Sequence, residues 1–350
     1  MALGRIPLEE AIAQVRDVNL LFAKQRDPNS LLNRIDVQAD GQSDSFAAWL
    51  DEYQVIYVAE LEITGQPPAI KTLLNRKSIL NQARIQWGDV ALADITTKQV
   101  AAFLATIQGQ GKHATASKLR SILQHVFKVA EANGRIERGH NPVSVTSAVT
   151  AKTKRARLTL ETFQSIYETA AAFDPWVQNS MLLALVTAQR REDIGKATFK
   201  PAKGSNMWVE GDWLMVEQGK HGNKLRIPTS LTLQINGGMS VGTVIARCRD
   251  NVLSAHMIHQ TRTYPNCPAG SAVNLDLLSI RFSEARKRSG LTWLGNTPPT
   301  FHEIRSLSER LYKAQGNVDT QGLLGHKSAN MTAVYDDARG AEFKTVIVKT

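Results

Sequence analysis

Apolar residues recur at three-to-four-residue spacing along much of the first half of the chain, which is the spacing of amphipathic helices. The segments with this pattern are residues 45–61, 69–88, 96–111 and 113–134. Thr96 or Thr97 can cap the third segment at its start, and Gly109 and Gly134 fall where helices end. The pattern predicts a small bundle of four helices.

The second half of the chain mixes helical and strand patterns. Helices are predicted at residues 160–173, 175–193, 275–290 and 300–316. Residues 213–229 contain two β-prone runs around a Gly-rich turn, which predicts a hairpin, and residues 343–350 predict a short terminal strand. The fold class expected is therefore mainly α, with a helical domain followed by an α+β domain that contains a small sheet or hairpin.

Two aperiodic stretches suggest the domain boundaries. An amphipathic helix at residues 8–25 is followed by a polar, turn-rich segment, and a second segment without a clear period ends in a basic run. The predicted parts are an N-terminal helix and linker, a helical domain, an interdomain linker and a C-terminal domain, at residues 1–42, 43–145, 146–158 and 159–350.

Composition narrows the protein class. The chain has 350 residues, no signal-peptide pattern and no apolar run of the roughly 18 residues that a membrane span needs. Cys248 and Cys267 have neither disulfide nor zinc spacing, which favours a reducing compartment. We expect a soluble, intracellular protein that is not associated with a membrane.

Positive charge is concentrated in one part of the chain. Residues 65–157 contain 15 Lys and Arg against 4 Asp and Glu, whereas the rest of the chain contains 27 against 28. Such a block favours a phosphate backbone as partner, although a solvated basic surface is the alternative. The candidate DNA-contacting residues are Lys71, Arg76, Lys77, Arg84, Lys112, Lys118, Arg120, Lys152, Lys154 and Arg155.

Several kinds of chemistry have no support in the sequence. The chain contains no G-x-x-x-x-G-K-[ST], no G-x-G-x-x-G after a predicted strand, no H-E-x-x-H and no zinc spacing of Cys and His. We therefore expect neither a cofactor nor a metal.

The helix predicted from residue 300 offers an anion site. Thr300 and Glu303 have the spacing of a capping box, and His302 and Arg305, three residues apart, are expected on one side near the positive N-terminal end. That arrangement suits a phosphate, although an exposed His and Arg on an ordinary helix would look the same.

Four further residues have the chemistry to act on a phosphate. Arg190 follows an apolar helix, and Asp193 can either pair with it or orient it toward a ligand. Lys220 lies in the predicted hairpin turn, where it could protonate a leaving alkoxide. His326, at an expected helix start in "LLGH", precedes Tyr335 by nine residues.

The order Arg, hairpin Lys, His-x-x-Arg, Leu-Gly-His and Tyr resembles the active-site signature of the tyrosine recombinases, and in particular the lambda-type phage integrases. The resemblance is found in "LVTAQRREDI", "VEQGKHGNKLRIP", "PPTFHEIRSLSERLY" and "LLGHKSANMTAVYDDARG". "LADITTKQVAAFL" and "ASKLRSILQHVFKVAEANGRI" resemble the core-binding domain of that family, so the similarity covers residues 45–345. Residues 1–42 resemble only the end of the arm-binding domain.

The resemblance implies a role for each residue of the signature. Tyr335 would be the nucleophile that forms a 3′-phosphotyrosine, and Lys220 the general acid for the 5′-oxygen. Arg190 and Arg305 would bind the non-bridging oxygens. His302 and His326 would hydrogen-bond the phosphoryl group, with His302 accepting the tyrosine proton. Asp193 would support the site.

The function implied is site-specific recombination of double-stranded DNA at attachment sites, through a Holliday junction, by a tetramer and without ATP or metal. It would integrate and excise a prophage, with a DNA-bending host factor and an excisionase as possible partners. A decayed integrase that only binds DNA, or a topoisomerase of type IB, would share much of the sequence signal.

Overall fold

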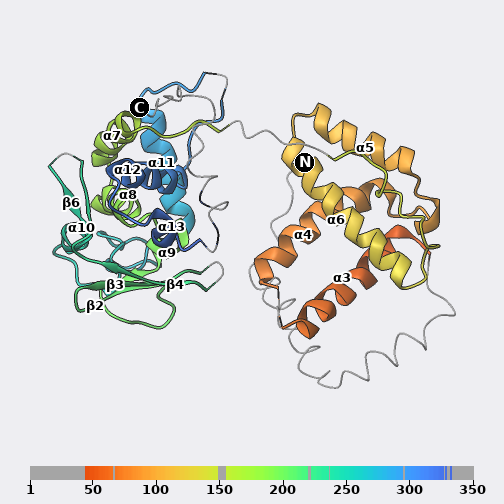
Figure 1. The fold of residues 1–350 in the computed structure, drawn as a ribbon, viewed down its shortest axis with the longest axis horizontal. Coiled ribbons are helices and arrows are strands. Elements are labelled where there is room, and N and C mark those ends of the chain that lie inside the picture. The colour runs from red at the N-terminus through yellow and green to blue at the C-terminus, as the bar shows by residue number, and fades with distance from the viewer. Residues whose placement is uncertain are drawn as a thin grey trace, which may run out of the picture. The chain divides into compact units, whose positions relative to one another are not determined.

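The computed structural model describes residues 44–65, 68–148, 155–219, 222–235, 237–294 and 296–326, together with Ser328 and Thr332. The chain divides into two compact units at residues 152 and 153, inside the segment predicted as the interdomain linker (Figure 1). The predicted N-terminal helix and terminal strand lie outside the described residues. Each unit is considered by itself below.

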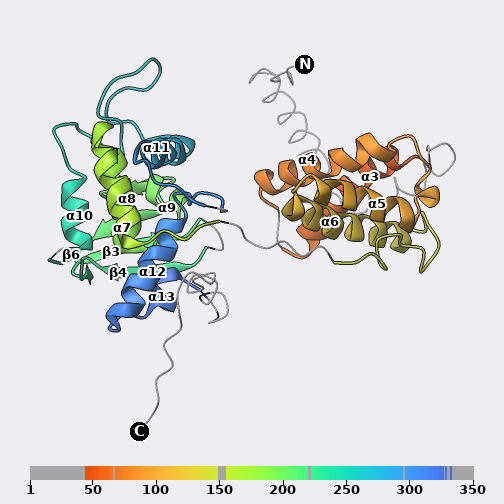
Figure 2. The same ribbon diagram turned by 90° about the horizontal axis from the view of Figure 1, so that it is seen from above.

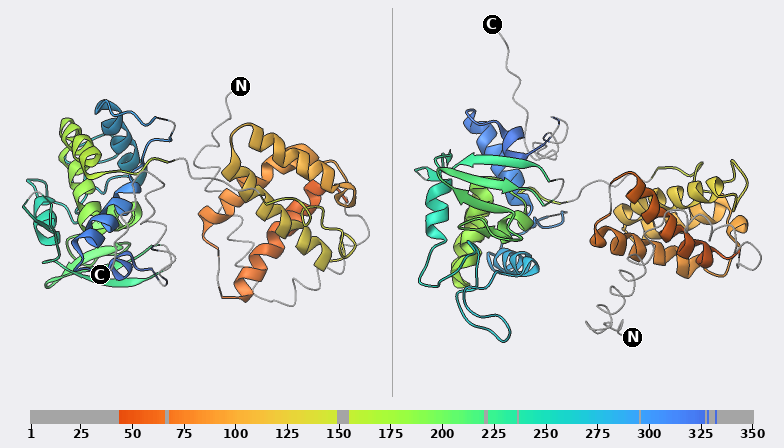
Figure 3. Two further views of the ribbon diagram at one scale, coloured as in Figure 1. Left: turned by 45° about the horizontal axis from the view of Figure 1, so that its top comes forward. Right: turned by 90° about the horizontal axis from the view of Figure 1, so that it is seen from below.

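The first unit contains the four predicted helices (Figure 3). They are α3 (Phe46–Ile63), α4 (Ile70–Trp87), α5 (Thr97–Gly109) and α6 (His113–Ala132), with a short 3-10 helix, η1 (Leu92–Asp94), before α5. Thr96 caps α5 in a capping box with Gln99. Phe46 packs against both Trp87 and Phe127 in the centre of the bundle, which joins three helices in one core.

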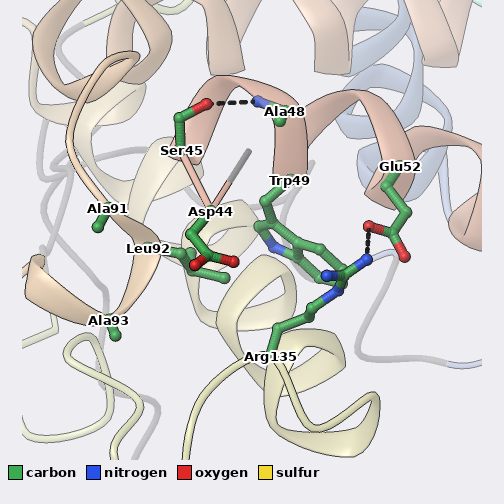
Figure 4. A pocket seen from close by; sticks show the side chains of 9 residues that line it. All are labelled: Asp44, Ser45, Ala48, Trp49, Glu52, Ala91, Leu92, Ala93 and Arg135. Atoms are coloured by element: carbon green, nitrogen blue, oxygen red, sulfur yellow. Dashed lines mark hydrogen bonds and ion pairs between the residues drawn. The ribbon is translucent and has the colours of Figure 1, made fainter. Parts of the chain in front are cut away.

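A cavity of about 220 Å³ lies beside the start of α3 (Figure 4). Ser45 caps α3 by accepting a hydrogen bond from the Ala48 amide at 3.3 Å. Trp49 lines the cavity, and Glu52 forms an ion pair with Arg135 at 2.7 Å. This pair ties α3 to the segment after α6, so the cavity belongs to the packing of the bundle end.

The second unit is built around α8 (Pro175–Thr187) (Figure 2). Its residues from Trp176 onward are buried apart from Gln178. The other elements are α7 (Leu160–Thr169), η2 (Ala170–Ala172), α9 (Arg191–Gly195), α10 (Val241–Arg247), α11 (Leu275–Arg288), α12 (Glu303–Gln315) and α13 (Thr320–Leu324). Helices α10, α11 and α12 all pack against α8. Helix α8 has apolar residues on every side because nearly all of it is buried within the unit.

A four-stranded sheet in the order β1-β2-β3-β4 lies along one side of this unit (Figure 1). Its strands are β1 (Ala197–Thr198), β2 (Met207–Glu210), β3 (Trp213–Glu217) and β4 (Lys224–Pro228). The predicted hairpin is confirmed, since β3 and β4 are antiparallel. Strand β2, which was not predicted, pairs with β3 across a two-residue turn in which Gly211 has a φ of 57°. The remaining strands, β5 (Thr232–Leu233) and β6 (Met239–Ser240), form a separate pair.

Two local expectations are wrong. Helix α12 starts at Glu303 itself, and the Glu303 carboxylate accepts a hydrogen bond from Arg157 at 3.1 Å instead of closing a capping box with Thr300. The "LLGH" segment ends a helix and does not begin one, because Asp319 caps α13 at its start and Gly325, with a φ of 65°, ends it. At α12 a tertiary contact with Arg157 replaced the capping box, and at α13 the left-handed Gly325 ended the helix.

The fold class is confirmed: two mainly helical units, the second with a small sheet. None of the helices in the described part of the chain is long and apolar enough to cross a membrane.

Candidate active site

Arg305 is a buried charged group where α12 meets the ends of α8 and α13. It is 1% exposed, and its Nη1 donates to the Ala188 carbonyl at 2.5 Å while Nη2 donates to the Leu324 carbonyl at 2.6 Å. Nη2 also lies 3.3 Å from His326 Nε2. These contacts hold the guanidinium in one orientation, because the fork of donors matches fixed backbone acceptors.

Arg190 comes to the same place from the end of α8. The helix ends at Thr187, and Ala188 adopts a left-handed conformation with a φ of 55°. The Arg190 Nη1 donates to Gln218 Oε1 at 2.8 Å. The neighbouring Arg191 turns to α11 instead, where its Nη1 donates to Ser279 Oγ at 2.6 Å. Among the described residues, Arg190 contacts Gln218 beside Arg305, whereas Arg191 contacts α11.

His326 follows the C-terminal end of α13 and is 7% exposed. Its Nδ1 lies 3.0 Å from Thr332 Oγ1, and its Nε2 faces the Arg305 guanidinium. A guanidinium has only donors, so the neutral ring must accept at Nε2 and carry its proton on Nδ1. Burial, together with the positive charges of Arg305 and Arg190, lowers the pKa of His326 to about 4. The ring is therefore neutral at physiological pH.

This pKa predicts a stability change with pH. The unfolded chain binds a proton at His326 below about pH 6.5, whereas the folded protein does so only near pH 4. Unfolding free energy should thus fall as pH drops from 6.5 to 4, by on the order of 3 kcal/mol from this residue. Thermal unfolding of wild type and His326→Gln between pH 7.5 and 4 measures the difference. The exposed His113→Gln is the control, and identical pH slopes for wild type and His326→Gln would contradict the prediction.

His302 lies immediately before α12, and part of its side chain is exposed to solvent. Its pKa is lowered, first by loss of hydration around the ring and then by the positive charge of Arg305; Arg190 and Arg155 add to this, while Glu303 opposes it. A neutral imidazole can accept a proton, which is what a general base requires. The positive charges of Arg305 and Arg190 lower the pKa of both histidines, so all four groups belong to one electrostatic environment.

Asp193, in α9, does not contact Arg190. Its Oδ1 accepts hydrogen bonds from the Gly219 amide at 3.0 Å and from Asn206 Nδ2 at 3.2 Å. The carboxylate therefore fixes the end of β3, one residue before Lys220. Neither the proposed ion pair with Arg190 nor a direct orienting bond to it is found; Asp193 supports the hairpin instead.

Lys220 and Tyr335 lie outside the described residues. Their assignment rests on the sequence and stays a prediction.

The candidate DNA-contacting residues fall into three groups. Lys71, Lys77, Lys112 and Lys118 are exposed on or next to α4 and α6, and Arg155 lies close enough to affect the pKa of His302. Arg76, Arg84 and Arg120 have internal partners, namely Tyr53, Asp51 and Thr146, with which a phosphate would compete. Lys152 and Lys154 lie outside the described residues.

Two buried glutamines in this site escaped the sequence analysis. Gln189 Nε2 donates to the Leu323 carbonyl at 2.8 Å, and Gln218 Nε2 donates to Gln189 Oε1 at 2.8 Å. Gln189 directly follows the apolar run that ends at Ala188, which was an available signal because a buried amide needs partners; Gln218, between Glu217 and Gly219, gave none. No group of three or more His, Cys, Asp or Glu that could hold a metal occurs in the described ranges.

The positive charges of Arg190 and Arg305 complement the negative charge of a phosphoryl group during transfer. The guanidinium groups of Arg190 and Arg305 can bind non-bridging oxygens, and the neutral imidazoles of His302 and His326 can exchange a proton or a hydrogen bond with them. Charge that develops on a pentavalent phosphorus would be stabilised there without a metal ion.

Comparison with known protein families identifies both units. Residues 156–342 match the model of the phage integrase family, and residues 71–148 match that of the phage integrase central domain.

Curated relatives are similar over nearly the whole chain. Prophage integrase IntE of Escherichia coli K12 is 37% identical over 340 residues, which cover 96% of this chain and 87% of that protein. The integrase of Enterobacteria phage P21 is 35% identical over 344 residues, covering 97% and 88%. The integrase of Escherichia phage lambda is 37% identical over 303 residues, covering 86% and 78%.

Solved structures of lambda integrase are similar to this chain in fold and sequence. A lambda integrase dimer bound to a COC′ core site has a TM-score of 0.77 at 33% identity, with 100% of this chain and 92% of that chain covered. A lambda integrase tetramer bound to a Holliday junction has a TM-score of 0.76 at 32% identity and the same coverage.

Proposed function

The chain belongs to the phage integrase family, and we propose that it is a site-specific recombinase that cuts and rejoins DNA through a phosphotyrosine at Tyr335. The observation that supports the mechanism is the contact of Arg305 with His326, together with the effect of the Arg190 and Arg305 charges on the pKa of both His302 and His326. Such a set of groups suits one phosphoryl group.

In the cleavage step the Tyr335 oxygen attacks the scissile phosphorus. An O–P bond to the tyrosine forms and the bond from phosphorus to the 5′-oxygen breaks, so the number of phosphate ester bonds is unchanged. His302 accepts the phenol proton, and Lys220 gives a proton to the departing 5′-oxygen. Arg190 and Arg305 stabilise the charge on the non-bridging oxygens.

Religation reverses these transfers with a different strand. A free 5′-hydroxyl attacks the phosphotyrosine and gives its proton to Lys220, while His302 returns the phenol proton to the departing Tyr335 oxygen. Because the ester energy is kept in the covalent intermediate, neither ATP nor a metal ion has to supply it.

The partners proposed follow from the relatives. Lambda integrase is seen as a dimer on core-site DNA and as a tetramer on a Holliday junction. We infer that this chain likewise acts on double-stranded DNA as a tetramer, with integration and excision of a prophage as the outcome. A DNA-bending host factor and an excisionase are further expected partners, and the substrate places the reaction in the host cytoplasm.

A nicked suicide substrate tests the proposal. When the nick lies close to the scissile phosphate, the short 5′-fragment diffuses away after cleavage and religation cannot occur. The full chain should then form a covalent protein–DNA adduct in the presence of a chelator, visible on a denaturing gel and located by peptide mass spectrometry. Absence of an adduct on attachment-site DNA that the protein binds would favour a decayed integrase. Relaxation of supercoiled DNA without strand exchange would favour a topoisomerase.

Binding to DNA should depend steeply on salt. Exposed lysines of the first unit would release counterions from the phosphates, so affinity should fall by roughly 10³-fold or more between 50 and 200 mM salt. Lys71→Gln combined with Lys77→Gln should make the salt slope shallower by about two units. Lys200→Gln with Lys203→Gln, an equal loss of charge at exposed positions outside the candidate set, is the control. A flat response in wild type would contradict binding through the backbone.

A further inference from the structure

Gln218 directly follows β3 and is 1% exposed, yet none of the roles above requires it. All of its side-chain hydrogen-bonding groups have partners in the site. Oε1 accepts from Arg190 Nη1 at 2.8 Å, while Nε2 donates to Gln189 Oε1 at 2.8 Å and to the Leu324 carbonyl at 3.1 Å. One amide thus joins the end of α8 to the end of α13.

The orientation of this amide follows from its partners. Arg190 can only donate, and the Leu324 carbonyl can only accept, so Oε1 must face Arg190 and Nε2 must face Leu324. Neither a carboxylate nor a thioether of similar size can reproduce this set, because a carboxylate has no hydrogen to donate and a thioether is at best a weak acceptor. An amide of this length is required at the position.

The Leu324 carbonyl connects Gln218 with the second arginine. Arg305 Nη2 donates to the same oxygen at 2.6 Å. Gln218 is therefore bonded directly to Arg190 and, through one shared carbonyl oxygen, to Arg305. Displacing the amide would release one arginine and remove a neighbour of the other.

Gly325 leaves room for this amide. A Cβ at Gly325 would lie 2.9 Å from Gln218 Oε1 and 3.0 Å from Nε2, closer than carbon atoms normally approach. The backbone of Gln218 is also held, since its amide donates to the Asn223 carbonyl at 2.9 Å. The side chain thus has one position, bounded on one side by a glycine of the "LLGH" segment.

We propose that Gln218 is a positioning residue that sets the relative placement of Arg190 and Arg305 around the scissile phosphate. The proposal rests on the recombinase function proposed above. It explains why a buried strand end contains an amide and why the residue before His326 has no side chain.

Gln218→Met tests this role in the full chain. Core-site DNA affinity should stay within about threefold, because the contacts that supply it lie elsewhere, whereas single-turnover cleavage should slow by roughly 10–100-fold. A substrate with a neutral methylphosphonate at the scissile position needs less charge stabilisation, so the variant should lose only about threefold on it. A merely structural defect would slow both substrates equally.

Gln178→Met is the matched control. Gln178 Nε2 donates to the Tyr167 carbonyl near the start of α8, about 14 Å along the helix axis from its end, so this variant also loses amide bonds within the unit. It should cleave both substrates at close to the wild-type rate.

A second pair of variants decides the matter if Gln218→Met does not fold. Gly325→Ala and Gly316→Ala put the same side chain at left-handed helix ends, of α13 and α12, but a Cβ at Gly316 meets nothing within 4 Å. Both should lose about 1–2 kcal/mol of stability, and only Gly325→Ala should also lose cleavage selectively on the phosphodiester.

The outcomes separate the two proposals. If wild type forms no adduct, the recombinase function is contradicted. If wild type forms the adduct and Gln218→Met, or failing that Gly325→Ala, cleaves like wild type or slows equally on both substrates, the positioning role alone is contradicted.

Discussion

Tyr335→Phe is expected to abolish the covalent protein–DNA adduct on the suicide substrate. The substitution removes one oxygen atom, the atom that bonds to phosphorus, and leaves the aromatic ring in place. No other group in the proposed mechanism can form the 3′-phosphotyrosine, so the cleavage rate should fall by roughly 10⁴-fold or more. DNA affinity, measured by filter binding, should remain within about twofold because phosphate contacts elsewhere supply it.

The matched control is Tyr264→Phe. Tyr264 is an exposed tyrosine of the same unit, and its hydroxyl donates to Asp174 at 3.3 Å on a surface loop. This variant should form the adduct at the wild-type rate. An adduct that persists in Tyr335→Phe would show that another residue is the nucleophile, and its modified peptide would identify that residue.

Substitutions of Arg305 should have the second largest effect on the cleavage rate. Two of them should distinguish the contribution of Arg305 to stability from its contribution to cleavage. In Arg305→Ala the carbonyls of Ala188 and Leu324 lose their donor and a cavity forms, which should cost about 3 kcal/mol of unfolding free energy. Arg305→Lys keeps the charge but cannot reach both carbonyls with one fork of donors. We expect it to lose about 1 kcal/mol of stability yet cleave roughly 100-fold more slowly.

Arg310→Lys provides the comparison on the same helix. Arg310 Nη2 donates to the Leu158 carbonyl at 2.6 Å and belongs to the packing between α12 and the start of the unit. Its replacement should lower the melting temperature slightly and leave the cleavage rate unchanged. If Arg305→Lys cleaves as fast as Arg310→Lys, Arg305 has a structural role and does not stabilise the transition state.

The packing of α12 shows how far local sequence rules reach. The spacing of apolar residues alone predicted a helix at residues 300–316, and Phe301, Ile304 and Leu307 are buried while Leu311 is partly buried. The prediction of a capping box at Thr300 was wrong, because the Glu303 carboxylate accepts a hydrogen bond from Arg157, 146 residues earlier in the chain. A local motif competes with every distant charge that folding brings near, and a buried ion pair with Arg157 was available here.

Asp193 illustrates the same limit within the site. The short sequence separation between Asp193 and Arg190 suggested an ion pair between them. Arg190 precedes the short helix α9 and Asp193 lies within it, and the Asp193 carboxylate accepts a hydrogen bond from the Gly219 amide instead. The functional expectation of a supporting residue remains a proposal, with the hairpin as the feature it supports.

The sequence alone determined the longer helices and the β3–β4 hairpin, the block of positive charge and the order of the residues proposed to act on phosphate. These depend on periodicity, caps and composition, which act over a few neighbouring residues or over the whole chain at once. Only the tertiary structure decided which groups meet: Gln189 bonds to a carbonyl 134 residues away, and Gln218 to one 106 residues away. Such pairs arise from the packing of α8, α12, α13 and the sheet, because a buried polar atom bonds to whichever partner that packing brings within reach.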